Sequence, residues 1–124
     1  MQDRYQHCMN RFKDNDNVSL WLGKSDDCFS EMVKALTEKS CFWLDAHAEG
    51  GGVPTFNELN VIKNSSIKDH TIIIDDIPVY FSGQVAALEE KLLSINNDYT
   101  IEYFPVDLGG QKGRVDDYEL VAYV

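Results

Sequence analysis

Three aspartates stand where two apolar runs of the sequence end. Asp45 follows residues 41–44, and Asp75 and Asp76 follow residues 71–74. In an open parallel sheet, ligands bind outside the carboxyl ends of the strands. Three carboxylates gathered there suit a hard divalent ion with oxygen ligands, such as Mg²⁺. The sequence therefore predicts a metal site at Asp45, Asp75 and Asp76. The alternative is that they are solvated acids at strand ends and helix caps.

His47 lies two residues after Asp45 and, on an extended backbone, points to the same side. A histidine side chain titrates close to neutral pH, so His47 is a candidate catalytic general base. The alternative is a histidine that caps its loop or hydrogen-bonds a neighbour. Gly50, Gly51 and Gly52 follow, and glycines permit close backbone approach. They form either a lid over the site or a flexible connection that binds no ligand.

Charge and composition exclude several classes of partner. The chain has 124 residues, which fits one domain, and its net charge of −10 comes from 21 acids against 11 bases. This balance disfavours nucleic acid and an anionic membrane surface, because both need clustered cations. No apolar run reaches the roughly 18 residues of a spanning helix, and no signal-peptide pattern opens the sequence. We expect one cytoplasmic domain, residues 1–124, with a small-molecule substrate.

Apolar periodicity predicts the elements that position these side chains. Helices are expected over residues 2–13, 25–39, 55–63 and 82–95. Strands are expected over residues 18–22, 41–44, 71–74, 100–106 and 118–124. Ser25 fits a helix N-cap, and Thr55 with Glu58 fits a capping box. The alternation of helices and strands predicts parallel pairing through right-handed crossovers, and the last two strands predict an antiparallel hairpin.

Four segments in this order carry a family resemblance: residues 42–47 (FWLDAH), 50–52 (GGG), 54–59 (PTFNEL) and 72–76 (IIIDD). They resemble class I S-adenosylmethionine-dependent methyltransferases. They are similar to those of glycan and natural-product gene clusters and to the macrocin O-methyltransferase-like group. The resemblance covers the C-terminal half of the family's domain. It implies a three-layer, Rossmann-like, mostly parallel α/β sheet with a C-terminal antiparallel hairpin and missing N-terminal strands. It also implies a metal at the aspartates that orients a substrate diol.

The sequence departs from the family where the cofactor binds. The family holds S-adenosylmethionine with a glycine-rich turn after its first strand and an acidic residue after its second, and neither segment is present. Residues 50–52 follow the family's fourth strand and lack the G-x-G-x-x-G spacing. S-adenosylmethionine is therefore a cofactor by resemblance only, and we expect that the chain does not bind it alone.

The missing strands also leave an edge of the sheet open. The family orders its strands three, two, one, four, five, seven and six, so residues 41–45, the fourth strand, lose a neighbour. An open edge promotes aggregation. Either residues 18–22 pair there or a second chain, such as another copy in a homo-oligomer, covers the edge.

Three functions remain at this point. The first is a methyltransferase-like protein that performs metal-assisted O-methyl transfer to a sugar or small hydroxylated metabolite. The second is a non-catalytic Rossmann-like binding or oligomerisation module. The third is a partial chain that a partner completes.

Overall fold

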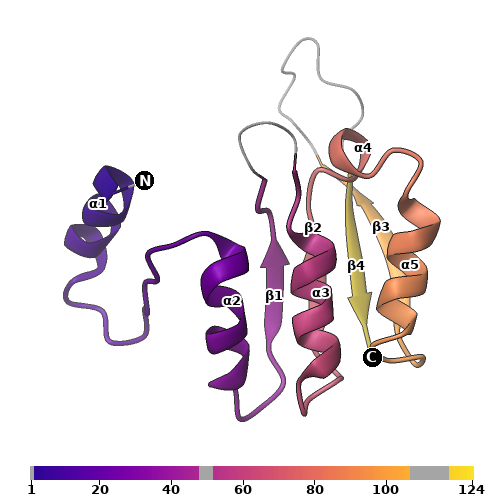
Figure 1. Cartoon of the computed structure of the whole chain (residues 1–124), viewed down its shortest axis with the longest axis horizontal. Helices are drawn as coiled ribbons and strands as arrows, with labels where there is room; N and C mark the ends of the chain where they lie inside the picture. Colours follow the sequence, from indigo (N-terminus) through magenta and orange to yellow (C-terminus); the bar gives the residue numbers. More distant parts are fainter. Residues whose placement is uncertain (1, 48–51, 107–117) are drawn as a thin grey trace.

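The computed structural model describes residues 2–47, 52–106 and 118–124. Five helices and four strands lie in these ranges (Figure 1). The helices are α1 (Gln2–Phe12), α2 (Ser25–Lys34), α3 (Thr55–Asn64), α4 (Ile77–Tyr80) and α5 (Val85–Leu93). The strands are β1 (Cys41–Leu44), β2 (Thr71–Ile74), β3 (Thr100–Pro105) and β4 (Tyr118–Tyr123). Among these described helices, none has the length and apolar character required to cross a membrane.

The four strands form one mixed sheet in the order β1-β2-β4-β3. β1 and β2 are parallel, with Cys41 opposite Thr71 and Leu44 opposite Ile74. β4 lies between β2 and β3 and is antiparallel to both. This order is the one that the resemblance gives to its fourth, fifth, seventh and sixth strands, and the last two strands do pair antiparallel. Only one of the three strand pairs is parallel, however.

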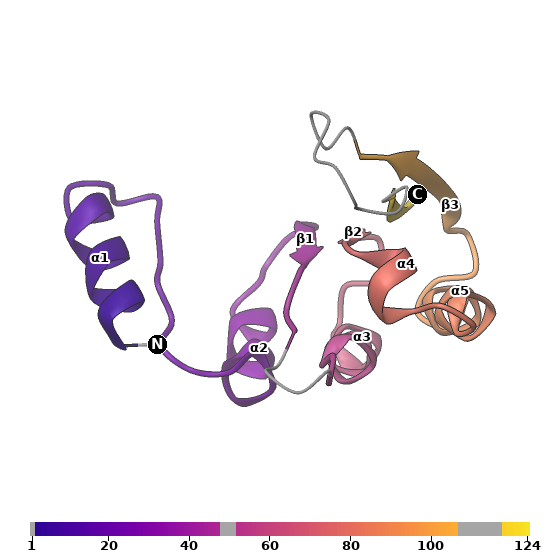
Figure 2. The ribbon, with the colours of Figure 1, turned by 90° about the horizontal axis from the view of Figure 1, so that it is seen from above.

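The expected three-layer, mostly parallel Rossmann-like sheet is therefore wrong. Helices α2, α3 and α5 lie along one face of the sheet (Figure 2). The connection from β1 to β2 and the connection from β2 to β3 step across the sheet in the same direction. Right-handed connections that step in one direction place their helices on one face. A second helical layer needs a reversal of that direction, which the described elements lack. The fold is a two-layer α/β arrangement.

The core lies between this helical layer and the sheet. Strand side chains alternate between the two faces, so every second residue points toward the helices. Core side chains from both layers have no exposed surface: Ile72, Ile74, Leu120 and Ala122 from the strands, and Leu59, Ile62, Leu88 and Leu92 from the helices. Burying an aliphatic side chain of this size contributes about 1.5–3 kcal/mol. This packing against the helices therefore fixes the positions of β1 and β2.

The two helix caps expected from the sequence are not formed. Lys24 and Pro54 occupy the N-cap positions of α2 and α3, and neither makes a side-chain capping bond. Instead the Ser25 hydroxyl donates a hydrogen bond to Oε1 of Glu58, joining the two helices. Glu58 is 3 % exposed, and this burial raises the pKa of its carboxyl group, while the bond from Ser25 opposes the rise. Both residues fit a local capping pattern, but in the structure they bond each other and so join α2 to α3.

Residues 18–22 do not form the expected strand, and β1 pairs only with β2 among the described residues. The prediction that residues 18–22 fill the open edge beside β1 is wrong. These residues lie beside α1, and the two segments line a common groove that includes Tyr5, Met9 and Trp21. Helix α1 has no buried residue. The N-terminal arm, residues 2–22, stands away from the body beyond β1 (Figures 1 and 2).

Candidate metal centre

The parallel pairing of β1 with β2 brings the two aspartate-ended segments together. Leu44 is opposite Ile74, so Asp45 and Asp75 follow at neighbouring positions of the same edge. The backbone N–H of Asp75 donates to the carbonyl oxygen of Leu44 at 3.2 Å, which extends the pairing to the aspartates. The expectation that both strands end at a common rim is confirmed.

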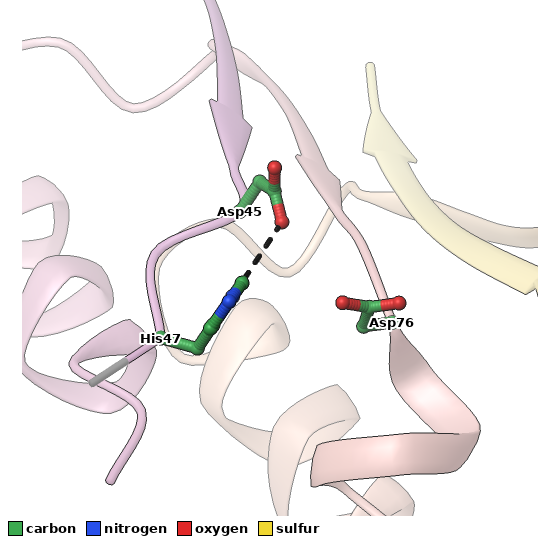
Figure 3. A group of neighbouring side chains, drawn as sticks. All are labelled: Asp45, His47 and Asp76. Carbon is green, nitrogen blue, oxygen red and sulfur yellow. Dashed lines mark ion pairs between the residues drawn. The ribbon is translucent and has the colours of Figure 1, made fainter. Parts of the chain in front are cut away.

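The residues that converge at this rim are Asp45, His47 and Asp76 (Figure 3). Each offers one ligand atom, and these atoms all lie within 4.8 Å of one another. The metal site predicted from the sequence named Asp75 in place of His47. Asp75 lines the same cavity but is not one of the three, and its Oδ1 accepts a hydrogen bond from the backbone N–H of Asp76 at 2.7 Å.

A left-handed turn at Asp76 separates the roles of the two neighbouring aspartates. Asp76 has φ 53° and ψ 37°, and it is the N-cap residue of α4. Aspartate and asparagine tolerate this conformation better than other residues with a Cβ atom. The turn ends the alternation of β2, so adjacent side chains do not simply point to opposite faces. Asp76 therefore reaches the group at the rim while Asp75 holds the turn.

Two contacts orient the imidazole of His47. Its Nδ1 atom lies 4.0 Å from Oδ1 of Asp45, and its ring stacks on Tyr80 with centroids 5.3 Å apart and an interplanar angle of 18°. Tyr80 was not among the residues predicted for the site. A signal was present, because Pro78 directly after Asp76 and Ile77 is typical of the first turn of a helix, and this helix carries Tyr80. The stacked ring keeps the histidine beside the carboxylates.

The donor set is chemically different from the one expected. Two carboxylates and one imidazole suit Mn²⁺, Fe²⁺ or Zn²⁺ better than Mg²⁺, which prefers oxygen ligands alone. Ligand atoms bonded at about 2.1 Å to one tetrahedral ion lie about 3.4 Å apart. The group therefore has to contract by up to about 1.4 Å to share one ion. A rim that is open to solvent on the Asp45 and His47 side permits such a movement.

The space at the rim is small. Among the described residues, a cavity of about 10 Å³ is lined by Leu44, Asp45, Ala46, His47, Val53, Thr55, Asp75, Asp76, Tyr80 and Phe81. About this volume is needed to hold one water molecule. The cavity therefore suits an ion or a water molecule, and it is far too small for S-adenosylmethionine. Of the three glycines, Gly50 and Gly51 lie outside the described residues, so their role as a lid stays a prediction.

Comparisons with known proteins do not assign the chain to a class. No protein-family model matches it, and no curated protein and no solved structure matches it either. The function must therefore be inferred from the geometry at the ends of β1 and β2.

Proposed function

We propose that this protein binds a divalent cation through Asp45, His47 and Asp76 and uses it to hold a small hydroxylated molecule. The observation that carries the proposal is the convergence of three ligand atoms within 4.8 Å at the carboxyl ends of two parallel strands. The stacking of His47 on Tyr80 supports it, because metal sites need ligands whose orientation is fixed by their surroundings.

The chemistry follows from the number of ligands. Three protein ligands leave open coordination positions for water or a substrate oxygen. A cation held there lowers the pKa of a hydroxyl group that it binds, which prepares the oxygen for attack on an electrophile. In this arrangement His47 is a ligand, and its role as a general base applies only to a chain that binds no metal.

The family resemblance makes O-methyl transfer the reaction that we propose for such an oxygen. The oxygen would attack the methyl carbon of a sulfonium donor, the carbon–sulfur bond would break toward sulfur, and the hydroxyl proton would leave to solvent. The described residues offer the acceptor side, because their cavity at this rim is of water size. We propose that S-adenosylmethionine is held by groups outside residues 1–124, such as a partner chain that completes the site.

Calorimetric titration with Mn²⁺, Zn²⁺ and Mg²⁺ tests the cation site. We expect saturable binding of Mn²⁺ or Zn²⁺ that is tighter than that of Mg²⁺. Asp45→Asn and Asp76→Asn each weaken it at least about tenfold, or ~1.4 kcal/mol. The matched control is Asp75→Asn, which removes a charge from the same rim but keeps an oxygen that accepts the bond from Asp76. Equal losses in all three variants would restore the sequence-based site, and a flat trace for every metal would reject both.

Thermal unfolding with and without S-adenosylmethionine tests the placement of the cofactor. A ligand at 100 times its Kd adds about 2.7 kcal/mol to the free energy of unfolding. We expect no change in Tm for this chain alone. A clear increase in Tm at millimolar ligand would show that the chain holds the cofactor by itself, and the proposal of a partner chain would fail while the cation site could stand.

A further inference from the structure

The face of the sheet opposite the helices carries a row of apolar side chains. Residues opposite each other in paired strands share a face. The register therefore places Trp43, Ile73, Val121 and Glu102 in one row across β1, β2, β4 and β3. Trp43 is 61 % exposed, and Phe104, on the same face of β3, is 46 % exposed. No described helix lies over this face (Figure 2).

The N-terminal arm carries a second apolar surface. Between α1 and residues 13–21 lies an open groove of about 630 Å³ whose apolar lining includes Tyr5, Met9, Phe12, Val18 and Trp21. Backbone hydrogen bonds from Asn15 to Phe12 and from Val18 to Asn15 hold the reversal of the chain that forms it. The arm therefore presents an organised apolar surface, and the arm itself stands apart from the body (Figure 1).

The two surfaces are compatible in charge and size. The arm, residues 2–22, carries three bases and three acids, a net charge of zero, whereas residues 25–124 carry 18 acids and seven bases, a net charge of −11. The apolar row on the sheet ends at Glu102, which is exposed. An 11-residue helix is about 16 Å long, and four paired strands span about 14 Å between the outer strand axes. A helix of this length crosses the whole row.

We propose that two copies of this chain associate by exchanging arms, each arm laying its apolar groove on the uncovered sheet face of the other copy. The arrangement has two-fold symmetry, so each chain covers one such face and has one covered in return. It removes Trp43, Phe104 and Met9 from water in one step. The arm, whose net charge is zero, then covers the acidic body of the partner, and this avoids the charge repulsion that two like sheet faces would have.

Sedimentation equilibrium over a range of concentrations tests the proposal. We expect a reversible monomer–dimer equilibrium, weakened at least about tenfold by Met9→Glu in the arm and by Trp43→Glu on the sheet. The matched control is Gln6→Glu, which adds the same charge to α1 at a residue whose side chain bonds exposed Asn10 and does not line the groove. Far-ultraviolet circular dichroism confirms that each variant is folded. A protein that stays monomeric at all concentrations would overturn the proposal.

A mixing experiment distinguishes arm exchange from other dimers. Met9→Glu keeps an intact sheet face, and Trp43→Glu keeps an intact arm, so a mixture of the two can form one intact contact per pair. We expect the mixture to associate more tightly than either variant alone. Association that is no tighter in the mixture shows that arm and sheet do not meet between copies. Protection of Trp43 from hydroxyl-radical oxidation in a monomer shows that the arm covers its own sheet, which also overturns the proposal.

Discussion

The two faces of the sheet are built from the same strands but differ in how far their side chains are exposed. On the helix side, Leu44 is 5 % exposed and Ile74 has no exposed surface, whereas their neighbour in the row behind, Trp43, is 61 % exposed. Single-sided sheets normally alternate apolar and polar residues, while strands covered on both faces are apolar throughout. β1 and β2 have the apolar composition of strands that are covered on both faces, but described helices cover only one of their faces. The core lies on the helix-covered face, and no described helix covers the other face, which we propose as the surface of association.

The largest expected effect distinguishes the two faces within one strand. Ile74→Ala removes a fully buried side chain from the core, and we expect it to lower the free energy of unfolding by about 2–5 kcal/mol. Ile73→Ala makes the same chemical change on the opposite face and should cost less than half as much in dilute solution. Urea denaturation measures both. Equal losses would mean that a further element covers the second face.

A buried carboxylate on the helix side gives the next effect. Ser25→Ala removes the hydroxyl that donates to Glu58, and a buried group left without its partner costs about 1–3 kcal/mol. The raised pKa of Glu58 sets the pH dependence. The stability that the Glu58 carboxyl group contributes is fully present below its pKa in the unfolded state and is lost as pH rises through its folded-state pKa. We therefore expect Ser25→Ala to lower the free energy of unfolding, measured with urea, more at pH 7 than at pH 4.

The matched controls for this prediction are Ser25→Ala combined with Glu58→Gln, and Glu102→Gln. The first removes the charge that was left unpaired and should recover part of the loss. The second changes an exposed acid on the other face, and we expect it to leave stability nearly unchanged. If Glu58→Gln instead deepens the loss at pH 7, the unpaired buried charge is not its cause.

Local sequence patterns predict those parts of this fold that depend on neighbouring residues. The apolar runs that end at Asp45 and Asp75 marked β1 and β2, and the helix between them implied their parallel pairing, which is correct. The position of β4 between β2 and β3 depends on pairing between distant segments, and no local pattern carries that information. The family resemblance supplied that order, whereas the mostly parallel sheet that it implied depends on strands that the described residues lack.

The candidate site shows the same limit. The sequence placed Asp45, His47 and Asp76 near one edge, because all three follow strand ends. It assigned Asp75 to the metal because two adjacent carboxylates are indistinguishable without backbone angles. The left-handed conformation of Asp76 is the backbone feature that distinguishes them in the structure. Likewise, Ser25 and Glu58 each fit a cap, and only the packing of α2 on α3 shows that they bind each other.

A buried histidine at the start of β2 predicts a pH dependence of the opposite sign. His70 is 1 % exposed, its Nδ1 accepts a hydrogen bond from the backbone N–H of Ser40 at 3.1 Å, and burial lowers its pKa. The unfolded chain therefore binds a proton at a higher pH than the folded chain does. Stability from this group is present above the unfolded pKa, about 6.5, and is lost as pH falls toward the folded-state pKa.

Thermal unfolding between pH 8 and pH 5 measures this effect. We expect His70→Asn, whose side-chain oxygen can still accept the bond from Ser40, to remove part of the slope of Tm against pH in this range. His7→Asn on exposed α1 should leave the slope unchanged. An unchanged slope in the His70 variant would show that another group on the covered side controls the loss of stability at low pH.

The smallest expected effect lies in the arm and completes the contrast between surfaces that stabilise and surfaces that associate. Helix α1 has no buried residue, so Met9→Ser should change the free energy of unfolding by less than about 0.5 kcal/mol when the protein is dilute. At high concentration the unchanged protein should gain stability through its dimer, because association favours the folded state, and the variant should not. Urea denaturation at several protein concentrations separates the stability of the monomer from the stability gained through the dimer.

If Met9→Ser lowered the free energy of unfolding by more than about 1 kcal/mol at every concentration, the arm would lie on its own body. The uncovered face would then belong to the fold's own core, and the distinction between the two faces would be lost.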